Sequence, residues 1–180
     1  LKFMKILINY NNNSNKKNLS NKLFFVDEGL NIRSLKKFIT TKEYLYVTDL
    51  FKNTDNKKKI SIFELSSSQS IILIKLERNI KNYEIENLGG DFFNFIKKLN
   101  KKEFVIDSDA ISIKIENLIG YFLHGIKLKS YKFEKYLTKK EKTNIKITVT
   151  GRNKPSIRDQ IRFKAIEEGT YYARDLVSEP

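Results

Sequence analysis

The sequence of 180 residues predicts an α/β fold, because segments typical of strands alternate along it with amphipathic helical patterns. The clearest strand is Ile71-Ile72-Leu73-Ile74, which is apolar on both faces and therefore belongs in the centre of a sheet. The clearest helix covers residues 83–99, where apolar residues recur at steps of three and four. A second long helical pattern begins near Pro155 and runs almost to the last residue.

The first part of the chain is expected to contribute most of the strands. Strands are predicted over residues 3–9, 23–26, 59–65 and 70–76, with Ser66-Ser67-Ser68-Gln69 joining the last two as a hairpin or a short crossing loop. Residues 31–39 are expected to form a helix that Asn31 caps. Residues 44–51 are ambiguous, because β-branched and aromatic residues occur there at helical spacing.

The predicted helix over residues 83–99 contains Gly89 and Gly90. A glycine inside a helix costs roughly 1 kcal/mol relative to alanine. We therefore expect this pair where the helix backbone lies close to the sheet.

The next segments continue the alternation of strands and helices. Strands are predicted over residues 104–106 and 145–149, the second with one face towards solvent. Between them a helix is expected, capped by Ser108 or Asp109 and ending near Gly125. This helix would bury Ile111, Ile115, Leu118 and Phe122.

The last predicted helix begins near Pro155, since proline is favoured in the first helical turn. Its apolar stripe consists of Ile157, Ile161, Ala165, Gly169, Ala173 and Leu176. The small residues in the middle of this stripe allow another element to approach closely. We expect the stripe to pack partly on the preceding domain and partly on sequence beyond Pro180, with Arg174 and Asp175 solvated.

The composition limits the kinds of site that the chain can hold. It has no cysteine and a single histidine, which excludes disulfides and the usual zinc clusters. The net charge is +14, but 29 of the 35 basic residues are lysine and 18 residues are asparagine. Joint enrichment of lysine and asparagine is typical of an AT-rich genome, whereas base readout favours arginine. We therefore attribute the charge mainly to codon composition.

Several polar groups could form sites, but each also has a structural interpretation. His124 lies at a predicted helix end, and Asp107-Ser108-Asp109 fits a helix cap better than a metal site. Gly151-Arg152-Asn153-Lys154 fits a basic turn before a helix better than an anion cradle. Residues 127–142 interleave lysine with aromatics, as in single-strand nucleic-acid grooves, but a linker with buried rings gives the same pattern. No catalytic, cofactor-binding or metal residue is predicted.

Three segments resemble the leucyl aminopeptidase family, in the family's order, over residues 23–180. Ala173-Arg174-Asp175-Leu176-Val177, followed by Ser178-Glu179-Pro180, resembles the segment that enters the catalytic domain, although the family usually has asparagine where Ser178 stands. Residues 122–136 resemble the end of a family helix and the Tyr-x-Phe-x-x-Tyr stretch after it. The strand Ile71 to Ile74 with Glu86-Asn87-Leu88-Gly89-Gly90 is similar to the family's strand-loop-helix.

The resemblance implies a macro-like N-terminal α/β domain over residues 1–135, with a mixed sheet flanked by helices. Residues 136–180 would form a connector and a long linking helix, and a catalytic domain would follow Pro180. Macro-like folds also occur in ADP-ribose binders, but the sequence shows no glycine-rich ligand loop.

By this resemblance the full-length protein is a cytoplasmic, homohexameric metallo-exopeptidase that releases N-terminal amino acids from peptides. The family holds two divalent metals, manganese or zinc, in residues that have no counterpart here, so we expect this chain to be inactive and to serve assembly and access to the site. The alternative is a free-standing basic α/β module that binds DNA or RNA weakly and without sequence preference. No apolar run is long enough to span a membrane.

Overall fold

A computed structural model describes residues 2–11, 21–29, 31–52, 58–132 and 141–178. The elements within these ranges are β1 (Lys2–Tyr10), β2 (Asn21–Val26), the 3₁₀ helix η1 (Arg33–Lys37), α1 (Thr41–Lys52), β3 (Ile60–Glu64), β4 (Ser70–Lys75), α2 (Asn82–Ile96), β5 (Glu103–Asp107), the 3₁₀ helix η2 (Ser108–Ala110), α3 (Leu118–Ser130), β6 (Glu141–Thr150) and α4 (Ile157–Ser178). The predicted α/β class is confirmed.

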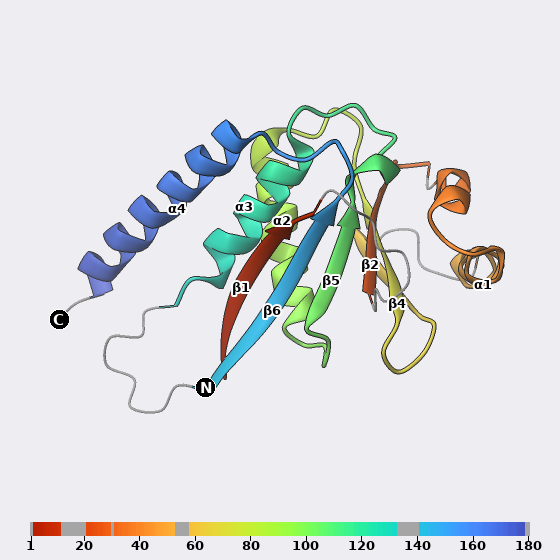
Figure 1. Cartoon of the computed structure of the whole chain (residues 1–180), viewed down its shortest axis with the longest axis horizontal. Helices are drawn as coiled ribbons and strands as arrows, with labels where there is room; N and C mark the ends of the chain where they lie inside the picture. Colours follow the sequence, from red (N-terminus) through yellow and green to blue (C-terminus); the bar gives the residue numbers. More distant parts are fainter. Residues whose placement is uncertain (1, 12–20, 30, 53–57, 133–140, 179–180) are drawn as a thin grey trace.

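The strands form one mixed sheet in the order β1-β6-β5-β2-β4-β3. Every neighbouring pair is parallel except β3 and β4, so of the two connections expected there the hairpin is the one that forms. Helices α2 and α3 cover one face, and η1 and α1 cover part of the other beside β2 and β4 (Figure 1). Strand β4 is buried on both faces because both layers of helices reach it.

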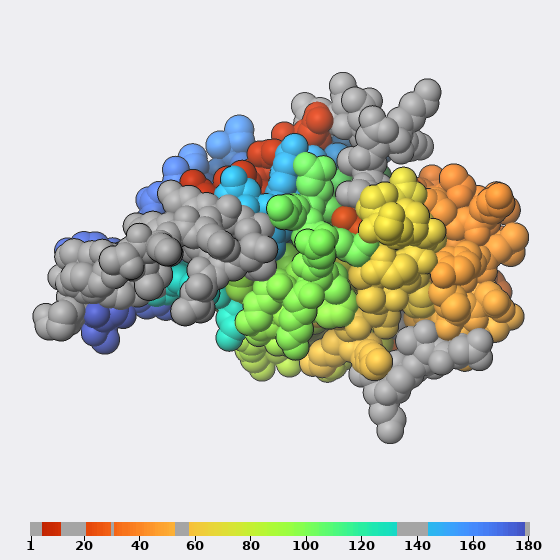
Figure 2. All heavy atoms as spheres, turned by 90° about the horizontal axis from the view of Figure 1, so that it is seen from below, coloured from red at the N-terminus to blue at the C-terminus, as the bar shows by residue number. Residues whose placement is uncertain are grey.

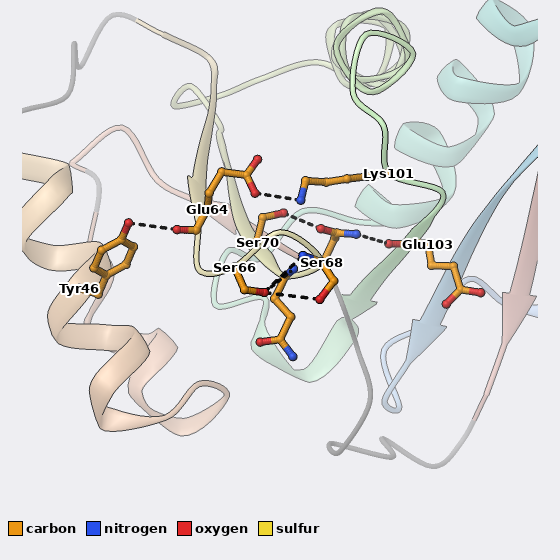
Figure 3. A network of polar contacts seen from close by, with 9 residues as sticks. Tyr46, Glu64, Ser66, Ser68, Ser70, Lys101 and Glu103 are labelled. Atoms are coloured by element: carbon orange, nitrogen blue, oxygen red, sulfur yellow. Dashed lines mark hydrogen bonds and ion pairs between the residues drawn. The ribbon is translucent and has the colours of Figure 1, made fainter.

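A buried polar bridge ties three strands together at their amino ends (Figure 3). The Ser70 hydroxyl donates to Oδ1 of Asn21 at 2.7 Å, and the Asn21 amide donates to the Glu103 carbonyl at 2.8 Å. Ser70 on β4 and Asn21 on β2 are 1% and 2% exposed, and the bridge continues to β5. A shift of one residue in register would break it, so the bridge specifies how these strands align.

Helices α2 and α3 approach each other through a glycine from each. A Cβ on Gly89 of α2 would lie 2.1 Å from the Phe122 carbonyl oxygen of α3. A Cβ on Gly125 of α3 would lie 1.9 Å from the Glu86 carbonyl oxygen of α2. The expectation that the Gly89-Gly90 pair faces the sheet is therefore wrong, because Gly89 makes room for a second helix.

The helix predicted to follow β5 begins later than expected. Only η2 follows the strand, where the Asp107 carboxylate accepts from the Asp109 amide at 3.0 Å. Helix α3 begins at Leu118, after Asn117, which has a positive φ of 54°, and it continues past Gly125 to Ser130. In residues 111–117 isoleucine alternates with polar residues, and these isoleucines pack partly buried against the core without forming a helix.

The structure also decides the conformation of two shorter segments. The helix expected over residues 31–39 is reduced to η1, although the Asn31 side chain does accept from the Arg33 amide at 3.1 Å. The ambiguous residues 44–51 lie in α1, where Val47 packs into the core.

Strand β6 lies inside the sheet, between β1 and β5. Ile145, Ile147 and Val149 point to the α2–α3 side and are buried, while Lys146 points to the opposite, solvent-facing side, as predicted. The sheet therefore extends beyond the boundary expected at residue 135 and ends at Thr150. Residues 133–140, which make up half of the basic segment 127–142, lie outside the described residues.

We expect Gly125→Ala to destabilise the protein by roughly 1–3 kcal/mol, because the new methyl group would meet a backbone oxygen that cannot move aside. Gly90→Ala is the matched control, since its Cβ would lie 3.6 Å from the flexible Lys129 side chain. The control should be neutral or more stable by up to about 1 kcal/mol through helix propensity. Chemical denaturation measures both, and equal behaviour of the two variants would contradict the close approach at Gly125.

Candidate interface around helix α4

Helix α4 is anchored on α3 by an aromatic and ionic contact near its middle. Phe163 is 7% exposed, and its ring centroid lies 5.2 Å from that of Tyr121 and 4.9 Å from that of His124. Nδ1 of His124 lies 2.9 Å from a carboxylate oxygen of Glu167. The histidine is only 4% exposed, so this pair is a buried link between the two helices.

Further hydrogen bonds hold the last turns of α4. The Tyr171 hydroxyl donates to the Lys127 carbonyl at 2.5 Å, and the Tyr131 hydroxyl donates to the Asp175 carboxylate at 2.5 Å. The Arg174 guanidinium donates to a backbone carbonyl of α3 at 2.8 Å and lies over the Tyr131 ring. The expectation that Arg174 and Asp175 are simply solvated is therefore wrong.

Glu167 places a negative charge among half-buried groups at this contact. Burial, assisted by this charge, raises the pKa of Tyr10 and the pKa of Tyr171 to about 12. Burial lowers the pKa of Lys127, although Glu167 opposes the shift. The Lys127 ammonium donates to the Ile6 carbonyl of β1 at 2.8 Å, which links α3 to the edge of the sheet.

The opposite side of α4 carries a row of exposed apolar side chains that pack on no other described element. Ile157, Ile161 and Leu176 are 76%, 64% and 54% exposed. A Cβ built on Gly169 would meet no described atom outside the surrounding turns of α4 within 4 Å. The expectation that this stripe packs partly on the preceding domain is wrong, because α4 turns its other side to α3. Figure 1 shows α4 flanking the α2–α3 layer, with its outer side free of other elements.

Known proteins share both the sequence and the fold of this chain. A probable cytosol aminopeptidase from Clostridium perfringens is 34% identical over 62% of the chain, which covers 25% of that protein. Another from Persephonella marina is 31% identical over 54% of the chain and 21% of its own length. A tomato leucine aminopeptidase mutant superposes with a TM-score of 0.73 at 14% identity, covering 99% of this chain and 39% of that one.

The chain is similar in sequence and fold to the N-terminal part of cytosol aminopeptidases. It spans about a quarter of the length of the curated relatives that it matches. The macrodomain of Thermus aquaticus DarG superposes with a TM-score of 0.51 at 8% identity, covering 82% of this chain and all of that one, which confirms the macro-like fold. No family model matches the sequence.

The polar groups that could form sites have structural partners in the fold. His124 binds Glu167, as described above, and the Asp109 carboxylate accepts from the Arg152 amide at 3.0 Å. Ser108 Oγ accepts from the Asn153 amide at 3.0 Å, so two amides of the turn after β6 are occupied and do not cradle an anion. Gly151, with φ of 89°, allows this turn to lie against Ser108.

Two negative findings concern the described part of the chain only. No three side chains of histidine, aspartate or glutamate gather there as a metal site would require. No helix there is both long enough and apolar enough to cross a bilayer.

A cleft of about 970 Å³ opens beside the start of α4, between residues 111–119 and residues 153–162.

The sequence patterns missed the anchoring face of α4. Phe163, Glu167, Tyr171 and Asp175 stand at steps of four and form this face. Their spacing is helical, but two of the four are acidic, so a search for apolar stripes ignores them. The amphipathic character of Tyr171 and the pairing of Glu167 with a buried histidine become visible only in three dimensions.

We expect Tyr10 and Tyr171 to ionise near pH 12, while tyrosines with the ordinary pKa of 10.0 ionise earlier. The folded-state pKa of each lies above the unfolded value, so their contribution to stability is complete below pH 10 and is lost as the pH rises towards 12. Tyrosinate absorbance and thermal melts over this range measure both effects. Tyr171→Phe should remove one late-ionising group, and simultaneous ionisation of all nine tyrosines near pH 10 would contradict the burial.

Proposed function

We propose that this chain is the N-terminal, non-catalytic region of a metal-dependent leucyl aminopeptidase. The observation that supports this most strongly is the uncovered outer face of α4, a helix whose inner face is already fixed to α3. An apolar stripe on a firmly anchored helix is typical of a surface that another element covers. The similarity to one part of cytosol aminopeptidases supports the proposal that their remaining region would be that element.

The proposed division of labour has three parts. The sheet domain, which we place over residues 1–150 because β6 belongs to it, would serve assembly and access to the active site. Helix α4 would link it to a catalytic region holding two divalent metals, manganese or zinc. The complete protein would be a cytosolic hexamer that releases N-terminal amino acids from peptides.

The isolated chain should not release leucine from leucinamide when manganese or zinc is added. The reason is that the residues described here do not gather a cluster able to hold a metal ion and activate a water molecule. Product release is measured against a buffer control and against a full-length cytosol aminopeptidase. Turnover that follows this chain through successive purification steps would show that the proposed division is wrong.

The substitution Gly169→Leu tests whether the outer face of α4 is exposed or is covered by another region. In this chain the substitution should be neutral, or stabilising by up to about 1 kcal/mol, because the position is open and leucine is the better helix former. In a protein that continues into a catalytic region it should cost roughly 1–3 kcal/mol through overpacking. Thermal melts of both lengths measure the difference.

Phe163→Ala is the matched control for this comparison, since Phe163 lies on the anchored face of the same helix. It should destabilise α4 in both lengths of the protein. Equal effects of Gly169→Leu in both lengths would remove the main support for the proposed contact.

A further inference from the structure

A small cavity lies on the side of the sheet that faces away from α2 and α3. Its volume is about 240 Å³, and it sits between residues 37–40, which follow η1, and strands β2, β5 and β6. This is below the range of roughly 300–1,000 Å³ that drug-sized ligands occupy. The cavity therefore suits a molecule that is smaller than a typical drug.

The wall of the cavity is apolar in its centre. Phe24 on β2 and Val105 on β5 are 3% and 6% exposed, and Phe38 and Ile39 close the opposite side. Val105 belongs to the half of this sheet face that α1 does not cover, because the neighbouring residues of β6 and β1 on that face, such as Lys146, are exposed. An apolar group of moderate size can lie against these side chains.

Charged groups of opposite sign stand at two places on the rim. Lys22 is the register partner of Val105, and Asp107 lies two residues further along β5. Residues two apart on a strand share a face and are separated by about 7 Å along it, so both side chains border the cavity. Lys37 lies on the same rim from the η1 side.

The charge balance of the rim is neutral. Lys22 forms an ion pair with Glu43 at 3.4 Å. Burial raises the pKa of Glu43, but hydrogen bonding by the Thr40 amide and the charge of Lys22 together hold this pKa below its usual value. One carboxylate oxygen of Asp107 accepts from the Asp109 amide, and the other has no bond or ion pair to any described residue. Lys37 likewise has no ion pair among the described residues. The rim thus offers one carboxylate oxygen and one ammonium to a ligand.

We propose that this cavity binds a free α-amino acid with an apolar side chain of about the size of leucine. The ligand's ammonium group lies at Asp107, its carboxylate at Lys37, and its side chain against Phe24 and Val105. A zwitterion fits because it matches both charges without adding net charge to a balanced rim. A role for such binding as a response to the product of peptide hydrolysis rests on the proposed function, whereas the binding itself does not.

Titration of L-leucine into the 180-residue chain, followed by the NMR shifts of the Val105 and Ile39 methyl groups, tests the site. We expect saturable shifts with a dissociation constant on the order of 1 mM or tighter. Leucinamide, which lacks the carboxylate, and 4-methylpentanoate, which lacks the ammonium, should each bind at least tenfold more weakly. Equal binding of either analogue would show that the site takes a simple amine or a simple acid and would overturn the proposal.

Asp107→Asn is the decisive variant, because asparagine keeps an oxygen for the Asp109 amide and so preserves η2. It should weaken leucine binding at least tenfold while leaving the melting temperature and the binding of 4-methylpentanoate unchanged. Asp49→Asn, on the exposed side of α1, is the control and should bind leucine normally. Unchanged leucine affinity in Asp107→Asn, or no saturation up to roughly 10 mM leucine, would also overturn the proposal.

The outcome of the binding experiment does not depend on the proposed function. The binding is measured in this chain without any catalytic region, so absence of binding leaves the aminopeptidase assignment untouched. Turnover or its absence with leucinamide and added metal, in turn, says nothing about Asp107.

Discussion

The close approach of α2 and α3 is the constraint on which most of this structure depends. Gly89 and Gly125 each face a carbonyl oxygen of the other helix, so the two backbones touch without side chains between them. The two helices can therefore lie side by side on the sheet as a thin layer, and Phe92 of α2 meets Phe122 of α3 beneath them at 5.4 Å between ring centroids. A larger side chain at either glycine would separate the helices and open this part of the core.

Because α3 is fixed in this way, it can act as the platform for α4. The inner face of α4 forms hydrogen bonds with backbone carbonyls and with His124 of α3. These bonds depend on a fixed position of α3. These bonds occupy Glu167, Tyr171 and Arg174 on the inner face and leave Ile157, Ile161 and Leu176 exposed on the other side. A helix anchored through polar groups and aromatic rings, with an aliphatic stripe facing outwards, can join a second globular region without losing its place on the first.

The sequence predicted the α/β class, all six strands and both long helices, since these depend on local periodicity. Hydrophobic periodicity could not predict which of two neighbouring elements a helix face packs against. It could not show that Gly89 faces a helix and not the sheet, nor that the inner face of α4 is built from Phe163, Glu167 and Tyr171. The cavity beside η1 was also out of reach, because Lys22, Lys37 and Asp107 meet only when the sheet places β2 next to β5.

The unequal covering of the sheet accounts for where the two candidate surfaces lie. Helices α2 and α3 cover one face, whereas η1 and α1 cover only the part of the other face beside β2 and β4. The cavity lies where the cover by η1 and α1 ends, next to β2 and β5. The exposed apolar side chains of α4 lie beyond the other edge of the sheet, on the side of β1. Figure 2 shows α4 and the η1–α1 segment at opposite ends of the molecule. The cavity and the exposed apolar residues of α4 are therefore separate surfaces, so occupation of one need not block the other.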